Sequence, residues 1–276
     1  MSKNSTLDKA YEYIRKNGSI LENAKLDIIF EKNIEKSKQI ILEHFKSLQN
    51  EDGGFPYQNI QGNISTINHT VSSLITLVDY GLTENLIIEK AIKFLFERQK
   101  KEGCWDEQHD LLLLNPPVWD TPENLFTQIW LTANTCHLLI LLNLKYSQYL
   151  MRGIEFLLQN RTKNGKINGY LLSNWIAIAI FSKLRDSESE IVKDFISVIG
   201  DNLEKILGTS DAVWCLRCFL DGGVSSKNYI LKILLEDIYK SQKSDGRWES
   251  VDGSEFDIKT TLEIVRLLKQ KIVNEV

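Results

Sequence analysis

The sequence predicts an all-α fold, and three observations predict it. Only 4 of the 276 residues are Pro, well below the average of about 5%, and Pro interrupts helices. The β-branched residues recur at helical spacing and not in the alternation that is typical of strands. A short motif also recurs along the chain, each time at the end of an amphipathic segment, and such repetition indicates a repeat architecture.

The repeated motif reads Gln, three polar residues, Gly, any residue and an aromatic ring. Full copies begin at Gln49, Gln99 and Gln242, and a degenerate copy that begins at Gln159 has two extra residues and lacks the ring. We expect the Gly of each copy to adopt the left-handed conformation that ends a helix.

Each copy predicts a charged outer helix before it and a more apolar inner helix after it. Helices that are apolar on nearly all sides are expected to be packed on both sides. The predicted outer helices are 33–49, 86–99, 147–159 and 227–242, and the predicted inner helices are 66–80, 120–144, 168–184 and 257–269. Two further pairs, 6–15 with 21–31 and 189–207 with 210–220, complete the set. Twelve helices in six hairpins predict one domain over residues 1–276, an α6/α6 toroid around a central cavity.

Charge and composition exclude several classes of protein. The chain has 33 Lys+Arg and 37 Asp+Glu, a net charge of −4, with both signs mixed, so we expect no basic surface and no nucleic-acid partner. No apolar run approaches the roughly 20 residues of a membrane span. With 4 Cys and no apolar core in the first twenty residues, a cytoplasmic protein is expected.

The repeats resemble the QW motifs of the squalene-hopene and oxidosqualene cyclases, and Val118-Trp119-Asp120-Thr121 is similar to the same family. The related protein prenyltransferase β-subunits share the toroid. The resemblance covers residues 33 to 270. It implies that the motif side chains tie neighbouring outer helices together. It also implies an isoprenoid-handling, terpene-cyclase-like enzyme, an isomerase or lyase, that acts on a polyprenyl substrate in the central cavity.

The chain departs from that family at its acid. The cyclase proton donor is the central Asp of an Asp-x-Asp-Asp-Thr motif, which is missing here. Alignment of the motif with residues 118–121 puts Trp119 at the position of the acid, and alignment with residues 257–260 puts Lys259 there. This absence favours an alternative, a non-catalytic toroid that binds a lipid or a peptide. A peptide-modifying enzyme is a third hypothesis, because fold does not determine function.

Long loops between outer and inner helices, at 50–65, 100–119 and 243–256, predict the end of the toroid that carries the site. The acids expected at the starts of inner helices are the candidate catalytic residues, Asp120, Asp211 and Asp257, although each is equally suited to cap a helix. The candidate substrate-binding residues are His69, Asn124, Phe126, Trp130, Trp175, Trp214 and Phe256. Their rings would stabilise carbocations by cation–π interaction, and packing in the core is the alternative.

Two further segments carry hypotheses. The apolar segment 111–119 is expected to be a plug over the barrel or else a lid or entry for a greasy substrate, and it also suggests peripheral contact with a membrane. The run Asp106–Asp110 faintly resembles the Mg²⁺-binding run of ionising terpene synthases, but we expect a solvated loop. No metal and no cofactor is expected, because Cys136, Cys215 and Cys218 lie in apolar helices without further ligands. The sequence carries no signal for an oligomeric state.

Overall fold

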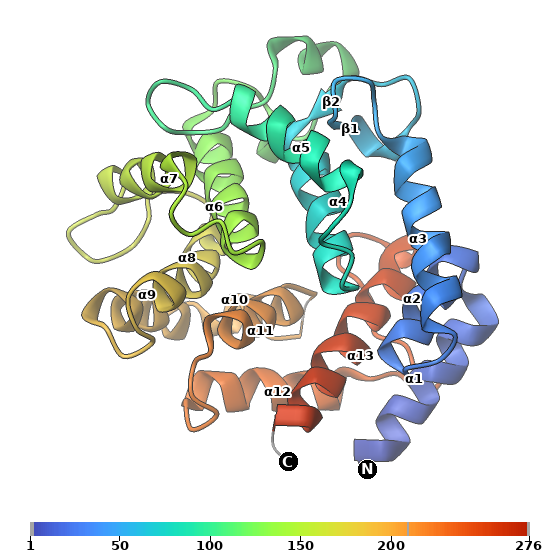
Figure 1. The fold of residues 1–276 in the computed structure, drawn as a ribbon. Coiled ribbons are helices and arrows are strands. Elements are labelled where there is room, and N and C mark those ends of the chain that lie inside the picture. Colours follow the sequence, from blue (N-terminus) through green and yellow to red (C-terminus); the bar gives the residue numbers. More distant parts are fainter. Residues whose placement is uncertain (1–2, 209, 275–276) are drawn as a thin grey trace. The chain divides into compact units, whose positions relative to one another are not determined.

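A computed structural model describes residues 3–208 and 210–274, and its regular structure is almost entirely helical (Figure 1). The helices are α1 (Lys3–Asn17), α2 (Ile20–Ile29), α3 (Ile34–Leu48), α4 (Ile67–Asp79), α5 (Leu86–Glu97), α6 (Leu125–Leu141), α7 (Gln148–Gln159), α8 (Leu171–Leu184), α9 (Glu190–Gly200), α10 (Leu203–Ile206), α11 (Ser210–Gly222), α12 (Tyr229–Ser241) and α13 (Asp257–Asn274). Short 3₁₀ turns are η1 (Tyr57–Asn59), η2 (His109–Leu114), η3 (Val118–Asp120) and η4 (Ser254–Phe256). Two antiparallel strands, β1 (Phe55–Pro56) and β2 (Ser65–Thr66), pair Phe55 with Thr66.

The chain forms two compact units. The first comprises Met1–Glu43 with Gly200–Val276, and the second comprises His44–Ile199. None of the helices in the described part of the chain is long and apolar enough to cross a membrane.

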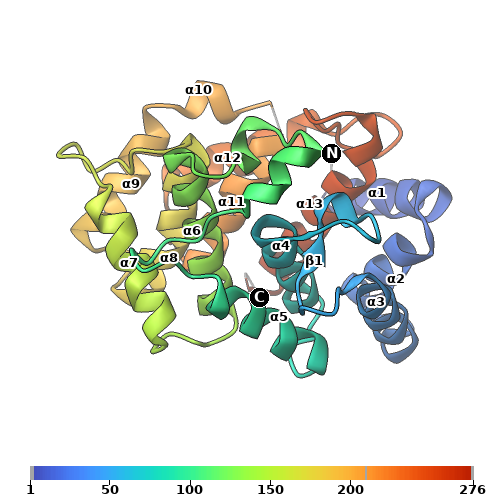
Figure 2. The same cartoon turned by 90° about the horizontal axis from the view of Figure 1, so that it is seen from above.

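In the second unit the predicted difference between inner and outer helices is confirmed. Residues 129–140 of α6 and 173–182 of α8 are buried without interruption, and these two helices lie side by side in both views (Figures 1 and 2). Helix α7 instead buries a single stripe against α6. An apolar helix needs cover on every side, whereas an amphipathic one needs it on one face.

In the first unit the two ends of the chain pack together. Helices α1 and α2 both contact α13, and α11 lies between α12 and α13. Helix α2 begins at a capping box in which the Ser19 hydroxyl accepts from the N–H of Glu22 and the Glu22 carboxylate accepts from the N–H of Ser19. Such a box satisfies two of the helix's free donors.

The repeated Gln makes the same two hydrogen bonds in each full copy of the motif. The Nε2 of Gln49 donates to the carbonyl of Gly53 and to that of Ile87 at the start of α5, both at 2.8 Å. Gln99 donates in the same way to Gly103 and Tyr149, and Gln242 to Gly246 and Thr6. Each copy therefore joins the end of one outer helix to another outer helix.

The backbone N–H of the motif ring bonds to an inner helix. The N–H groups of Phe55, Trp105 and Trp248 donate to the hydroxyls of Thr70, Thr132 and Thr261, at 2.9 to 3.0 Å. In the degenerate copy Ile167 donates to the Asn174 side chain at 2.8 Å. The motif is thus a joint between two outer helices and an inner one.

Two sequence-based expectations about these helices are wrong in detail. The motif Gly residues have positive φ, as expected, but they close a tight turn after the helix has ended instead of capping it, as in Gly53, whose N–H donates to Asn50. The segment 189–207 is two helices, because Asp201 and Asn202, which are poor helix formers, separate α9 from α10.

The predicted helix 120–144 begins five residues late, at Leu125. Thr121 precedes Pro122 and is extended, as a residue before Pro prefers to be. Glu123 then has a φ of 62° and Asn124 caps the helix. Asp120 therefore lies in η3, and not in the first turn of an inner helix.

Candidate active site

Three carboxyl groups are buried together in the second unit. Asp106, Glu107 and Asp120 are each only 3–4% exposed. The expectation of a solvated loop at 106–110 is therefore wrong for its first two residues, while Gln108, His109 and Asp110 are exposed. The preceding ring, that of Trp105, is fully buried as well.

Asp106 joins the motif loop to the segment before α6. Its carboxylate accepts from Lys100 Nζ at 2.6 Å, from Gln128 Nε2 at 2.9 Å and from the backbone N–H of Glu123 at 3.2 Å. The bond to Asp106 raises the pKa of Lys100. With three donors on its two oxygens, Asp106 is a structural residue.

Glu107 binds the start of α4. Its Oε2 accepts from the backbone N–H of Ile67 and its Oε1 from that of Asn68, both at 2.8 Å, so it satisfies two of the free donors of the helix. Burial raises the pKa of Glu107 to about 8 although these two donors lower it, and the charge of Asp120 raises it further. A buried carboxyl disfavours its charged form when desolvation exceeds hydrogen bonding.

Asp120 is held on one oxygen alone. Its Oδ1 accepts from Asn68 Nδ2 at 2.8 Å, and no group in residues 3–208 or 210–274 bonds to Oδ2. Burial raises the pKa of Asp120 to about 6, against the bond from Asn68, which lowers it. Asp120 is therefore a buried acid with one oxygen that forms no hydrogen bond within the described residues.

His69 supports this cluster from α4. Its Nε2 accepts from the backbone N–H of Gln58 at 3.0 Å, so the ring is neutral and its proton lies on Nδ1, 2.9 Å from the hydroxyl of Thr66. The ring of Tyr57 meets His69 edge to face at 5.3 Å, and the charge of Asp120 adds to burial in raising the pKa of Tyr57. His69 thus holds the 57–66 loop beside Asp120.

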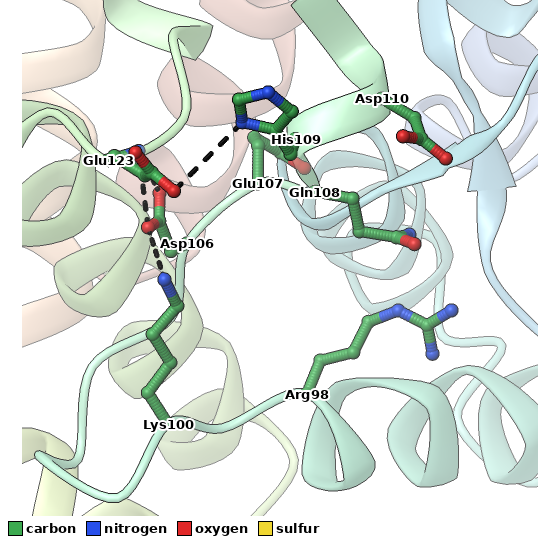
Figure 3. Close-up of a pocket in the computed structure, with 8 residues that line it drawn as sticks. All are labelled: Arg98, Lys100, Asp106, Glu107, Gln108, His109, Asp110 and Glu123. Atoms are coloured by element: carbon green, nitrogen blue, oxygen red, sulfur yellow. Dashed lines mark hydrogen bonds and ion pairs between the residues drawn. The ribbon is translucent and has the colours of Figure 1, made fainter.

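A polar pocket of about 470 Å³ reaches the cluster from the solvent (Figure 3). It is lined by Arg98, Lys100, Asp106, Glu107, Gln108, His109, Asp110 and Glu123. Arg98 is bound by Asp52 at 3.1 Å and Lys100 by Asp106, so both cations are already neutralised. This pocket suits water and small polar molecules, and its lining does not suit an isoprenoid chain.

The other two predicted acids lie in the first unit. Asp257 is the first residue of α13; its Oδ1 accepts from the N–H of Ser250 at 2.8 Å and its Oδ2 lies 3.2 Å from Arg247 Nε. Asp211 is half-buried at the start of α11, and burial and the charge of Asp252 raise its pKa. A pocket of this unit, about 230 Å³, is lined by neither of them.

The predicted substrate-binding residues fall into three groups. Asn124 caps α6 through its side chain. Trp130 and Trp175 are buried, and Trp175 Nε1 has no hydrogen-bond partner in the described part of the chain. Phe126, Trp214 and Phe256 are 40–41% exposed. Phe126 lies edge to face with Tyr170 at 5.5 Å.

The four Cys residues are buried thiols. Burial raises the pKa of Cys104 to about 11 and raises the pKa of Cys136, Cys215 and Cys218 as well, which disfavours the thiolate that metals bind. The described residues contain no group of three His, Cys, Asp or Glu side chains that could hold a metal ion.

Solved structures share this fold. A protein from Actinoplanes matches 98% of this chain and 100% of its own with a TM-score of 0.68 at 12% identity. The type II terpene cyclase MstE from Scytonema matches 98% of this chain and 99% of its own, with a TM-score of 0.62 at 12% identity. This chain has the fold of the type II terpene cyclases.

A variant of MstE in complex with geranylgeranyl dihydroxybenzoate, its substrate, also matches, with a TM-score of 0.62 at 11% identity over 97% of each chain. No protein-family model and no curated protein matches the sequence. The fold class predicted from the sequence is confirmed.

Sequence reasoning missed Glu107 and Asn68. Glu107 follows a motif ring by two positions, where the third copy has Ser250, so its place in the repeat carries no signal for a buried carboxyl. Asn68 lies in the first turn of a predicted inner helix, and an amide there is common for capping reasons alone.

Proposed function

We propose that the protein is a terpene-cyclase-like enzyme in which Asp120 protonates a polyprenyl substrate. The observation that carries this proposal is the carboxyl of Asp120, which is buried, held by Asn68 on Oδ1 and open on Oδ2. With its pKa raised to about 6, about a tenth of it stays protonated at pH 7, and a protonated acid away from water is the group that an alkene needs for protonation.

The chemistry follows from that group. The proton on Oδ2 adds to one carbon of an alkene, and the other carbon becomes a cation that the next double bond attacks, which forms a ring. The last cation then loses a proton or takes up water, so that the reaction is an isomerisation or a hydration. Aromatic faces stabilise the intermediate cations, which is the role we assign to the predicted rings on the inner helices.

A polyprenyl substrate is supported by the fold and by the apolar inner helices. MstE, which shares the fold, binds geranylgeranyl dihydroxybenzoate. In this chain α6 and α8 present almost no charged side chain. We therefore propose a class of substrate, the polyprenyl compounds, and no single compound, since fold by itself does not determine the substrate.

The test is product formation by wild type and the Asp120→Asn variant. Each is incubated with geranylgeranyl dihydroxybenzoate, squalene and polyprenyl diphosphates, and products are identified by mass spectrometry. We expect a cyclised product from wild type and a loss of at least about 100-fold in Asp120→Asn. Asp257→Asn is the matched control and should keep its activity, because that carboxyl already binds Ser250 and Arg247. Undiminished product from Asp120→Asn would remove this acid from the mechanism.

A binding module is the second candidate, and the missing Asp-x-Asp-Asp-Thr motif favours it. Trp119 or Lys259 occupies the position of the central acid in the two possible alignments. If wild type forms no product from any substrate, yet carries an extractable isoprenoid or lipid after purification, the protein is a binder.

We also propose peripheral membrane contact through the apolar segment 111–119. Leu111 is buried and anchors the segment, while Leu113 is 82% and Trp119 is 55% exposed. Exposed leucine and tryptophan side chains are typical of segments that enter a membrane interface. Residues 106–126 contain no Lys or Arg, so the contact would be apolar and would not depend on anionic lipids.

A further inference from the structure

The two buried carboxyls with raised pKa values meet on one residue. The backbone N–H of Asn68 donates to Glu107 Oε1, and the side-chain amide of the same residue donates to Asp120 Oδ1, both at 2.8 Å. Because Asn68 is in the first turn of α4, the start of this helix fixes the positions of both carboxyl groups.

No Lys or Arg in residues 3–208 and 210–274 forms an ion pair with either carboxyl. The groups around it are Lys100 and Arg98, which are bound by Asp106 and Asp52, and His69, which is neutral. The remaining titratable groups nearby are Tyr57, His109, Asp110 and Glu123, of which the last three line the pocket. None of these forms a hydrogen bond with Glu107 or Asp120 within the described residues. The hydrogen bonds from Ile67 and Asn68 are then the compensation available to two buried charges, which favours a state in which one of the carboxyls keeps its proton.

We propose that Glu107 and Asp120, which both bind Asn68, titrate as one unit that holds a single proton near neutral pH. Glu107 lines the solvent pocket, so the pair exchanges its proton with water there. Both oxygens of Glu107 face backbone N–H groups, whereas Oδ2 of Asp120 is open. Asp120 is therefore the member that can pass the proton on, and Glu107 is a positioning residue.

Transfer of this proton to a substrate rests on the proposed function. The coupled titration of Glu107 and Asp120 does not. The experiment follows the carboxyl carbons of Asp and Glu by ¹³C NMR from pH 4 to pH 9 in the full chain without substrate. Signals of the two residues are assigned by comparison with Asp120→Asn and Glu107→Gln. Asp257→Asn, a buried carboxyl of the first unit, is the control.

Removal of the Asp120 charge should lower the titration midpoint of Glu107 by about one pH unit or more. Because Asp120 loses its proton first, while Glu107 is still protonated and neutral, Glu107→Gln should leave the midpoint of Asp120 nearly unchanged. Asp257→Asn should move neither midpoint.

The proposal is overturned if the midpoint of Glu107 is the same in wild type and Asp120→Asn. Asp120→Asn keeps a side-chain oxygen that can accept the hydrogen bond from Asn68. Its result therefore tests the proposal even if Glu107→Gln, which loses an acceptor for a backbone N–H, does not fold. If the Glu107 midpoint shifts as expected but the wild type forms no product, the coupled titration is supported and only the proposed enzyme activity is contradicted.

Discussion

Gln242 donates a hydrogen bond to the backbone carbonyl of Thr6, 236 residues earlier in the chain, at 2.9 Å. The same Nε2 also bonds to Gly246 at 3.0 Å. Thr6 is buried and lies inside α1, so this amide is a second donor to a carbonyl that also takes part in the helix. One side chain thus joins the end of α12 to α1 within the first unit.

Replacement of Gln242 by Ala should lower the free energy of unfolding by about 1–3 kcal/mol, because it removes the two hydrogen bonds that hold the end of α12 to α1 and to the motif turn. Gln159 is the matched control, since it holds the same place in the degenerate copy but is exposed. Within the part of the chain that the structure describes, its side chain bonds only to Glu155, at 3.5 Å. Gln159→Ala should change stability by less than about 0.5 kcal/mol. Urea unfolding followed by circular dichroism measures both, and equal losses would contradict the role of the motif as a joint.

Gly53 and Gly62 separate backbone strain from close packing. Both have positive φ, 87° and 93°, so Ala is strained at either position. An added Cβ at Gly53 would lie 2.6 Å from the carbonyl oxygen of Lys90, whereas nothing lies within 4 Å at Gly62. Gly53→Ala should therefore cost about 1–3 kcal/mol more than Gly62→Ala, as measured by thermal or urea unfolding. An equal cost would mean that α5 can move away from the turn.

Asp120 should make stability depend on pH in a known direction. Its pKa is raised from 3.8 to about 6, so between these values the folded state binds more protons than the unfolded one, and the free energy of unfolding falls as the pH rises. The shift of about two units corresponds to about 3 kcal/mol, present below about pH 4 and lost by pH 7. The raised pKa of Glu107 acts with the same sign.

Asp120→Asn lacks this titration, so wild type should lose about 3 kcal/mol relative to the variant between pH 4 and pH 7. Urea unfolding at both pH values checks it. A difference between the two proteins that does not change with pH would show that the Asp120 carboxyl is ionised throughout.

The apolar segment 111–119 should govern binding to vesicles. Leu113→Glu puts a charge on a side chain that is 82% exposed, so it should reduce co-flotation with phosphatidylcholine vesicles several-fold without loss of stability. Ile20→Glu is the control, because Ile20 is 77% exposed in the first turn of α2, where an acid is tolerated. Equal flotation of wild type and Leu113→Glu would exclude this segment as the contact.

The sequence by itself determined the helices and the joints between them. Apolar periodicity is local, and it distinguished α6 and α8 from α7 before any packing was known. The motif residues also recur with constant spacing, and their hydrogen bonds follow that spacing: Gln49 and Gln99 each reach the Gly four positions ahead. The late start of α6 was missed in the prediction from the sequence, although Thr121 precedes Pro122 and a residue before Pro is typically extended.

Only the tertiary structure decided which acids are buried. Asp106 and Glu249 follow the rings of two copies of the same motif, yet Asp106 is buried with Lys100, Gln128 and the N–H of Glu123 around it, whereas Glu249 is exposed. A buried carboxyl depends on the donors that distant segments bring to it. Asp120 has its amide from a helix 52 residues away, and no local pattern contains that information.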